Sequence, residues 1–244
     1  TVDDDPSDDS KSISIDPIVP AAGKAVVGEE ATGTWCQWCP RGAVYMDLFE
    51  ATYQDYWIGI AVHNGDPMTD ATYDAGMGSL IGGYPSAVVD RGADVDPSGM
   101  TADFLERLQT DPAAVLLNGA TWDPVTRVLE VSVKSTFSQN ASNSYKVACA
   151  LTEDGVTGTD GGYNQSNAYA GGGNGVMGGY EALPNPVPAS QMVYDHVARS
   201  IAPSFAGSSN SFPASINAGE DYKSNFSFTL PAGWDENNIH IIGM

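Results

Sequence analysis

The segment Thr34-Trp35-Cys36-Gln37-Trp38-Cys39-Pro40-Arg41-Gly42 contains two cysteines separated by two residues and followed directly by a proline. Cysteines at this spacing can close a small disulfide. Proline has no backbone N–H and fits the first turn of a helix, so Pro40 places a helix start next to the pair. Unpaired N–H groups and the dipole at that helix start favour a thiolate. The segment therefore predicts a reactive disulfide, with Cys36 as the nucleophile and Cys39 as the resolving thiol.

Strands and helices alternate around this segment. Apolar runs predict buried strands over residues 23–30, 56–63 and 86–90, and helical periodicity predicts helices over residues 39–53, 68–80 and from Thr101 onward. A short alternation over residues 12–18 predicts an additional edge strand. The order strand–helix repeated three times predicts a sheet covered by helices.

The pattern changes near residue 113, where alternation with period two replaces the helical period. Apolar residues alternate with polar or small ones in three places, at Leu129/Val131/Val133, at Tyr145/Val147/Cys149/Leu151 and at Phe226/Phe228/Leu230. Such strands bury one face, which predicts an antiparallel β-sandwich. The sequence thus predicts an acidic disordered leader over residues 1–11, an α/β domain over residues 12–112 and a β-sandwich domain over residues 113–244. The Gly- and Asn-rich stretch 155–188 is long enough to be a functional or mobile loop.

Residues 29–42 resemble the active-site segment of thioredoxin-like proteins from Bacteroidetes cell envelopes, and more narrowly that of the outer-membrane protein 28 family. The segments 83–85, 90–91, 151–155 and 194–199 are similar to other parts of that family. The resemblance implies a thioredoxin-like α/β domain followed by a β-sandwich. It also implies an exported thiol–disulfide oxidoreductase in the periplasm or outer membrane of a Gram-negative bacterium. Thioredoxin carries Gly-Pro between its cysteines, whereas this chain has Gln37-Trp38, so the direction of electron flow stays open.

Further site residues are predicted around the cysteine pair. Pro85 precedes the strand 86–90, the position of a cis-proline that faces the disulfide in thioredoxin-like folds, where an extended peptide can pair with the backbone. Glu30, at the end of the first strand, can accept a proton from Cys39. The aromatic side chains expected to bind substrate are Trp35, Trp38 and Tyr84.

Composition limits the partners of the chain. Its 10 basic and 31 acidic residues give a net charge of −21, which argues against nucleic-acid binding. Acidic loops, such as the one from Glu153 to Gly161, offer oxygen ligands for calcium, but EF-hand spacing is absent, so no cofactor is predicted. No apolar run reaches the length of a membrane span. The acidic opening without a methionine predicts a processed N-terminus, with an export signal or a lipid anchor upstream.

Other interpretations of the same residues stay open. The Cys36–Cys39 pair can be a structural disulfide, or half of a zinc site completed by Cys149 and a histidine. Glu30 can pair with Lys24, and structural roles are expected for Cys149, His63, His196 and Arg199. The function is therefore either a thiol–disulfide oxidoreductase, with protein thiols or disulfides as substrates and an unidentified redox partner, or a non-catalytic envelope protein whose β-sandwich carries the role. The oxidoreductase requires an accessible Cys36, whereas a structural disulfide predicts a buried pair.

Overall fold

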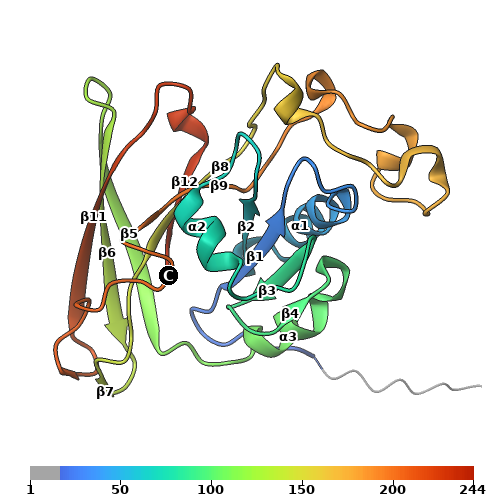
Figure 1. Cartoon of the computed structure of the whole chain (residues 1–244). Helices are drawn as coiled ribbons and strands as arrows, with labels where there is room; N and C mark the ends of the chain where they lie inside the picture. Colours follow the sequence, from blue (N-terminus) through green and yellow to red (C-terminus); the bar gives the residue numbers. More distant parts are fainter. Residues whose placement is uncertain (1–16) are drawn as a thin grey trace, which may run out of the picture.

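The computed structural model describes residues 17–244, and its largest sheet draws strands from both halves of the chain (Figure 1). The strand order in this seven-stranded sheet is β12-β8-β9-β2-β1-β3-β4. The strands are β1 (Val26–Thr32), β2 (Trp57–His63), β3 (Ser86–Val89), β4 (Asp94–Val95), β8 (Cys149–Glu153), β9 (Val197–Ala202) and β12 (Ile239–Gly243). β1 runs parallel to β2 and antiparallel to β3.

Three helices accompany the N-terminal strands: α1 (Pro40–Tyr53), α2 (Ala71–Met77) and α3 (Thr101–Leu108). Pro40 is the first residue of α1, as predicted. The predicted helix 68–80 is shorter in the structure, because the Asp70 side chain caps α2 by accepting from the backbone N–H of Tyr73. β1 begins three residues later and ends two residues later than the strand predicted over 23–30, so Glu30 lies inside it and not at its end.

An aromatic cluster fixes α1 and α3 to one face of the sheet. The ring of Phe49 on α1 lies 4.7 Å from that of Trp57 on β2 and 5.5 Å from that of Phe104 on α3, measured between ring centroids. All three side chains are buried. Contacts of this kind hold the start of α1, and with it the cysteine pair, at a fixed place over the sheet.

The C-terminal half adds a three-stranded antiparallel sheet of β5 (Ala114–Asp123), β6 (Val128–Phe137) and β11 (Asp221–Thr229). Two short strands, β7 (Ala141–Ser142) and β10 (Ser215–Ile216), form a separate pair. In Figure 1 the three-stranded sheet forms a layer at the left, beside β8 and β12. Its apolar face, including Val131 and Phe226, packs in one cluster with Cys149 and Leu151 of β8.

The separate β-sandwich domain expected from the sequence is not found in that form. The three-stranded sheet packs against the β12-β8-β9 end of the seven-stranded sheet, so strands that follow residue 112 lie in both sheets. β8 is buried on both faces, because Ala150 belongs to the cluster beneath the central sheet while Leu151 faces the second sheet. The predicted leader, residues 1–11, and most of the predicted strand 12–18 lie outside the described residues. Residues 17 and 18 are not in a strand.

Candidate functional site

Cys36 and Cys39 form a disulfide immediately before α1. Their sulfur atoms are 2.09 Å apart, and the two Cα atoms are 5.3 Å apart. Cys36 is 4% exposed and Cys39 is 2% exposed. The predicted disulfide is thus present, but the pair is buried, as the structural-disulfide interpretation predicts, and Cys36 lacks the exposure that the oxidoreductase interpretation requires. Cys36 can be approached only through the surroundings of the pair.

Those surroundings include a surface groove of about 350 Å³. The lining residues are Trp35, Cys36, Gln37, Trp38, Tyr84, Ser166 and Asn185. The three aromatic side chains predicted to bind substrate therefore meet beside Cys36. The Tyr84–Pro85 peptide bond is cis and Pro85 is buried, directly before β3. Burial, followed by the nearby Asp74 carboxylate, raises the pKa of Tyr84, which keeps this phenol uncharged near neutral pH.

The two indole rings of the groove are exposed on one side and held on the other. Trp35 is 51% exposed, yet its Nε1–H donates to the backbone oxygen of Asn64 at 2.7 Å. Trp38 is 37% exposed and packs edge-to-face on the buried ring of Tyr169, with centroids 5.6 Å apart. Both rings are thus oriented before any ligand arrives, which lowers the entropy lost on binding.

Behind the disulfide, Glu30 is 1% exposed on β1, and its Oε1 has no hydrogen-bond partner within residues 17–244. Burial raises the pKa of Glu30 from 4.5 to about 8, so the side chain is mainly a neutral acid at pH 7. Gly42 of α1 leaves the space for this carboxyl group, because a Cβ atom there would collide with it. The alternative partner Lys24 is engaged elsewhere, in an ion pair with Asp90.

Glu30 and Cys39 line the same cavity of about 110 Å³, together with His63, Tyr194 and the exposed Val193. A polar cavity of this size has room for a few water molecules. Water in this cavity can therefore connect the Glu30 carboxyl group with Cys39.

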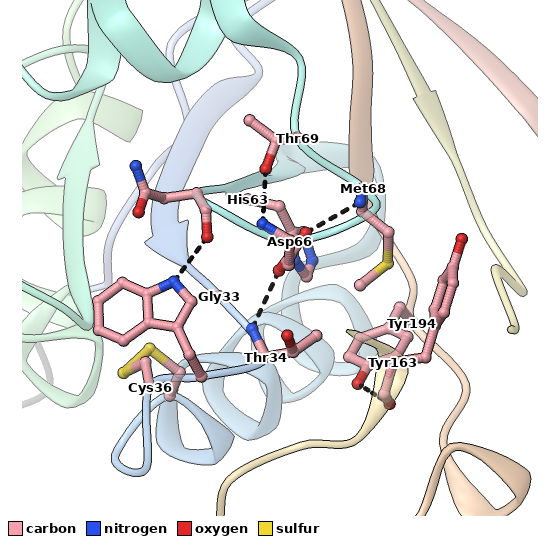
Figure 2. A network of polar contacts seen from close by, with 12 residues as sticks. Gly33, Thr34, Cys36, His63, Asp66, Met68, Thr69, Tyr163 and Tyr194 are labelled. Atoms are coloured by element: carbon pink, nitrogen blue, oxygen red, sulfur yellow. Dashed lines mark hydrogen bonds and ion pairs between the residues drawn. A yellow bond between two sulfur atoms is a disulfide. The ribbon is translucent and has the colours of Figure 1, made fainter. Parts of the chain in front are cut away.

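A second group of contacts holds the backbone that leads into the cysteine pair (Figure 2). The buried Asp66 carboxylate accepts hydrogen bonds from the N–H groups of Thr34, at 3.0 Å, and Met68, at 2.9 Å. It also lies 2.7 Å from Nδ1 of His63. His63 is thus tied to a carboxylate at the end of β2, which is the structural role expected for it.

The long segment between β8 and β9 supplies a third group of contacts, and sequence reasoning missed them. Figure 1 shows this segment in yellow and orange, reaching over the end of the molecule that carries α1. Its Gln165 is buried, and Nε2 of that side chain donates to the backbone oxygen of Cys36 at 3.0 Å. Ser166 N donates to Thr34 O at 2.7 Å, and Ala168 N donates to Gln37 O at 2.8 Å. The long segment is thus hydrogen-bonded to the cysteine turn, residues 34–39, at three positions.

In the sequence, only the unusual length of this segment indicated that it has a functional role. No spacing relates Gln165 or Ser166 to a motif, because their partners in the cysteine segment lie about 130 residues away along the chain. Asn185 reaches the groove from further along the same long segment. Asp66 follows β2 in the short stretch Asn64-Gly65-Asp66-Pro67, which is typical of a turn. Its contacts with Thr34 could not be read from that stretch.

The other titratable residues named in the sequence lie away from the groove. Cys149 is fully buried on β8, and burial raises its pKa to about 12. Arg199 pairs with Glu153 at 2.9 Å, and the backbone N–H of His196 donates to Asp154. Within residues 17–244, no three histidine, cysteine or acidic side chains are grouped so that they could hold a metal ion. No helix among the described residues is long and apolar enough to cross a membrane.

The position of Gln165 leads to a testable expectation. Gln165→Glu removes the NH₂ donor and places a carboxylate beside the backbone oxygen of Cys36, whereas Gln165→Ala only removes the donor. In the reduced proteins, iodoacetamide should alkylate Cys36 of Gln165→Glu about tenfold more slowly at pH 7 than Cys36 of Gln165→Ala, because the added negative charge opposes the thiolate. Equal rates in the two variants would show that Gln165 only stabilises the fold.

Comparison with solved structures gives a match in fold. HBP35 of Porphyromonas gingivalis superposes with a TM-score of 0.62 and 13% sequence identity, covering 90% of this chain and 68% of that one. A crystallised protein of Agrobacterium tumefaciens matches with a TM-score of 0.42 and 13% identity, over 83% of this chain and 78% of its own. No protein with a curated description matches the sequence significantly.

Comparison with protein families gives a more specific result. The model of the outer membrane protein Omp28 family matches residues 72–244. The matched range includes Pro85, Gln165 and Asn185 but begins after Cys36 and Cys39, so the family match does not extend to the disulfide. The match spans well over half of the chain, which therefore belongs to the outer membrane protein Omp28 family.

Proposed function

We propose that this chain is a thiol–disulfide oxidoreductase of the bacterial cell envelope, with a thioredoxin-like N-terminal half. One observation carries the proposal: the Cys36–Cys39 disulfide lies at the start of a helix and borders a groove made by the residues predicted to bind substrate. The order β1-α1-β2-α2-β3-β4-α3 and the cis Tyr84–Pro85 bond support the thioredoxin-like assignment. Membership in a family of outer membrane proteins supports the envelope location.

In the reductive direction, the reaction begins with Cys36 as a thiolate. Its Sγ attacks one sulfur of a substrate disulfide, forms a mixed disulfide and releases the other substrate sulfur as a thiolate. Cys39 then loses its proton and attacks Sγ of Cys36. The internal disulfide forms again, the second substrate sulfur leaves as a thiolate, and two electrons have passed from the enzyme to the substrate. A dithiol reductant restores the enzyme, and the same steps run in reverse oxidise a substrate dithiol.

Glu30 provides the acid–base partner that the resolving cysteine needs. A carboxylate at Glu30 can take the proton from Cys39 as the internal disulfide forms, and the neutral acid can return it when that disulfide opens. A pKa of about 8 suits both directions near neutral pH, since neither protonation state of Glu30 is rare there. The cavity shared by Glu30 and Cys39 supports this role.

Reduction of insulin by dithiothreitol tests the proposal. The protein at micromolar concentration should accelerate insulin precipitation about tenfold or more over dithiothreitol alone, because a positioned thiolate exchanges faster than a free thiol. The Cys149→Ala variant should match the wild type, since that thiol is buried away from the groove. No acceleration by a correctly folded, oxidised wild-type protein would refute the oxidoreductase.

The second candidate is a non-catalytic envelope protein in which the pair is a structural disulfide. Two observations favour it: both cysteines are nearly buried, and the family match begins beyond them. This candidate predicts that the disulfide resists dithiothreitol unless the protein is unfolded. The insulin assay therefore separates the two candidates directly.

A further inference from the structure

The groove beside Cys36 has two sides of different origin. Trp35, Trp38 and Tyr84 come from the N-terminal half, whereas Ser166 and Asn185 come from the long segment between β8 and β9. The backbone bonds of Ser166 and Ala168 to the cysteine turn hold that second side in place. The groove is thus incomplete without the segment.

Apart from the Cys36 thiolate that forms on reduction, none of the lining residues carries a charge near neutral pH, although the chain has a net charge of −21. The contacts that the groove offers are two pre-oriented indole rings, one phenol and a few uncharged hydrogen-bonding groups. The Asn185 Oδ1 accepts from the backbone N–H of Asn167 at 2.9 Å, which leaves the NH₂ group of Asn185 for a ligand. Amide and hydroxyl groups of this kind match the backbone of an extended peptide, and exposed indoles match an apolar side chain.

We propose that Ser166 and Asn185 determine substrate specificity, by making the groove an uncharged slot for an extended peptide with an aromatic side chain next to its disulfide-bonded cysteine. The proposal rests on the oxidoreductase function and adds the substrate class. The volume of about 350 Å³ lies at the lower end of the range for ligand sites, roughly 300–1,000 Å³, which suits a few side chains of a peptide strand and not a folded surface.

The test uses the reduced full chain and three peptide disulfides. Each is the symmetrical disulfide of a short acetylated, amidated peptide that carries Phe, Lys or Glu beside its cysteine. The wild type should reduce the Phe peptide about tenfold faster than the Lys or Glu peptide at 0.15 M salt, because charged side chains lose hydration in an uncharged groove without gaining a partner.

Asn185→Asp introduces one negative charge into the groove and keeps the oxygen that accepts from Asn167. It should accelerate reduction of the Lys peptide about tenfold, because the added carboxylate attracts the lysine ammonium group. It should slow reduction of the Glu peptide by a similar factor, because the two carboxylates repel each other. The matched control is Asn143→Asp, an exposed site beside β7, which Figure 1 places far from α1. This control adds the same charge and should leave all three rates within about twofold of the wild type.

The outcomes separate this proposal from the one on which it rests. Reduction of all three peptides at equal rates by the wild type would overturn the specificity proposal while leaving the oxidoreductase intact. Identical behaviour of Asn185→Asp and Asn143→Asp would overturn it as well. If the reduced wild type reacts with none of the peptides, the oxidoreductase itself is wrong.

Discussion

The free energy of unfolding of Glu30→Gln, measured relative to that of the wild type, should be several kcal/mol higher at pH 9 than at pH 4. Burial raises the pKa of Glu30 from 4.5 to about 8 in the folded protein, whereas the unfolded chain keeps the ordinary value. A raised carboxyl pKa contributes stability that is fully present below pH 4.5 and is lost as the pH rises through 8. The loss amounts to about 3–5 kcal/mol for a shift of this size. Glutamine does not titrate, so the variant does not lose this stability as the pH rises.

Urea denaturation of the oxidised proteins between pH 4 and pH 9 measures this effect. Glu106→Gln is the matched control, because that side chain is exposed on α3 and its substitution also removes one negative charge. The quantity of interest is the change in unfolding free energy between the two pH values, since any constant cost of burying an amide cancels. If Glu30→Gln shows the same pH dependence as Glu106→Gln, Glu30 does not have a raised pKa and the proposed proton exchange with Cys39 loses its basis.

Cys36→Ser and Cys39→Ser should both lose the roughly tenfold acceleration of insulin reduction over dithiothreitol alone, because one variant lacks the nucleophile and the other cannot resolve the mixed disulfide with a thiol of its own. They should differ in their first step. Cys39→Ser keeps a reactive thiol at position 36, which iodoacetamide alkylates within minutes, whereas Cys36→Ser should react much more slowly. Cys36→Ser retains two thiols: Cys39, which is 2% exposed and lines the cavity of Glu30 and not the groove, and Cys149, which is fully buried on β8.

Both serine variants lose the same disulfide, so the loss of this bond should lower their free energies of unfolding by similar amounts. Circular dichroism should show the same folded spectrum for both. Equal alkylation rates in the two variants would contradict the assigned roles, since the asymmetry between groove and cavity is what distinguishes Cys36 from Cys39.

Much of the disulfide site could be predicted from the sequence because local rules determine it. Pro40 fixes the first turn of α1, which places the cysteine pair at the helix start. Pro85 directly precedes β3, where the cis bond is found. Glu30 follows an apolar run, and it is buried although β1 extends further than predicted. In each case a residue within the element carries the signal.

The remainder depends on contacts between distant segments, which the sequence does not mark. β8 belongs to a segment whose alternation, at Tyr145/Val147/Cys149/Leu151, predicts a sandwich strand. It pairs with β9, however, and β9 pairs with β2 through Ala61 and Val197, which joins β8 to the central sheet. Alternation defines which face of a strand is apolar but not which strand lies beside it. Gln165 and Asn185 were missed for the same reason, because a polar residue in a long loop has no period to reveal its partner.

Trapping of a mixed disulfide tests the central claim most directly, namely that Cys36 exchanges with protein disulfides. Reduced Cys39→Ser should be incubated with an excess of oxidised insulin, quenched with acid and analysed by intact mass and peptide mapping. We expect one adduct per chain, which is linked through Cys36, is released by dithiothreitol and is absent with Cys36→Ser. No adduct on a folded Cys39→Ser chain, or an adduct of equal yield on Cys36→Ser, would contradict it.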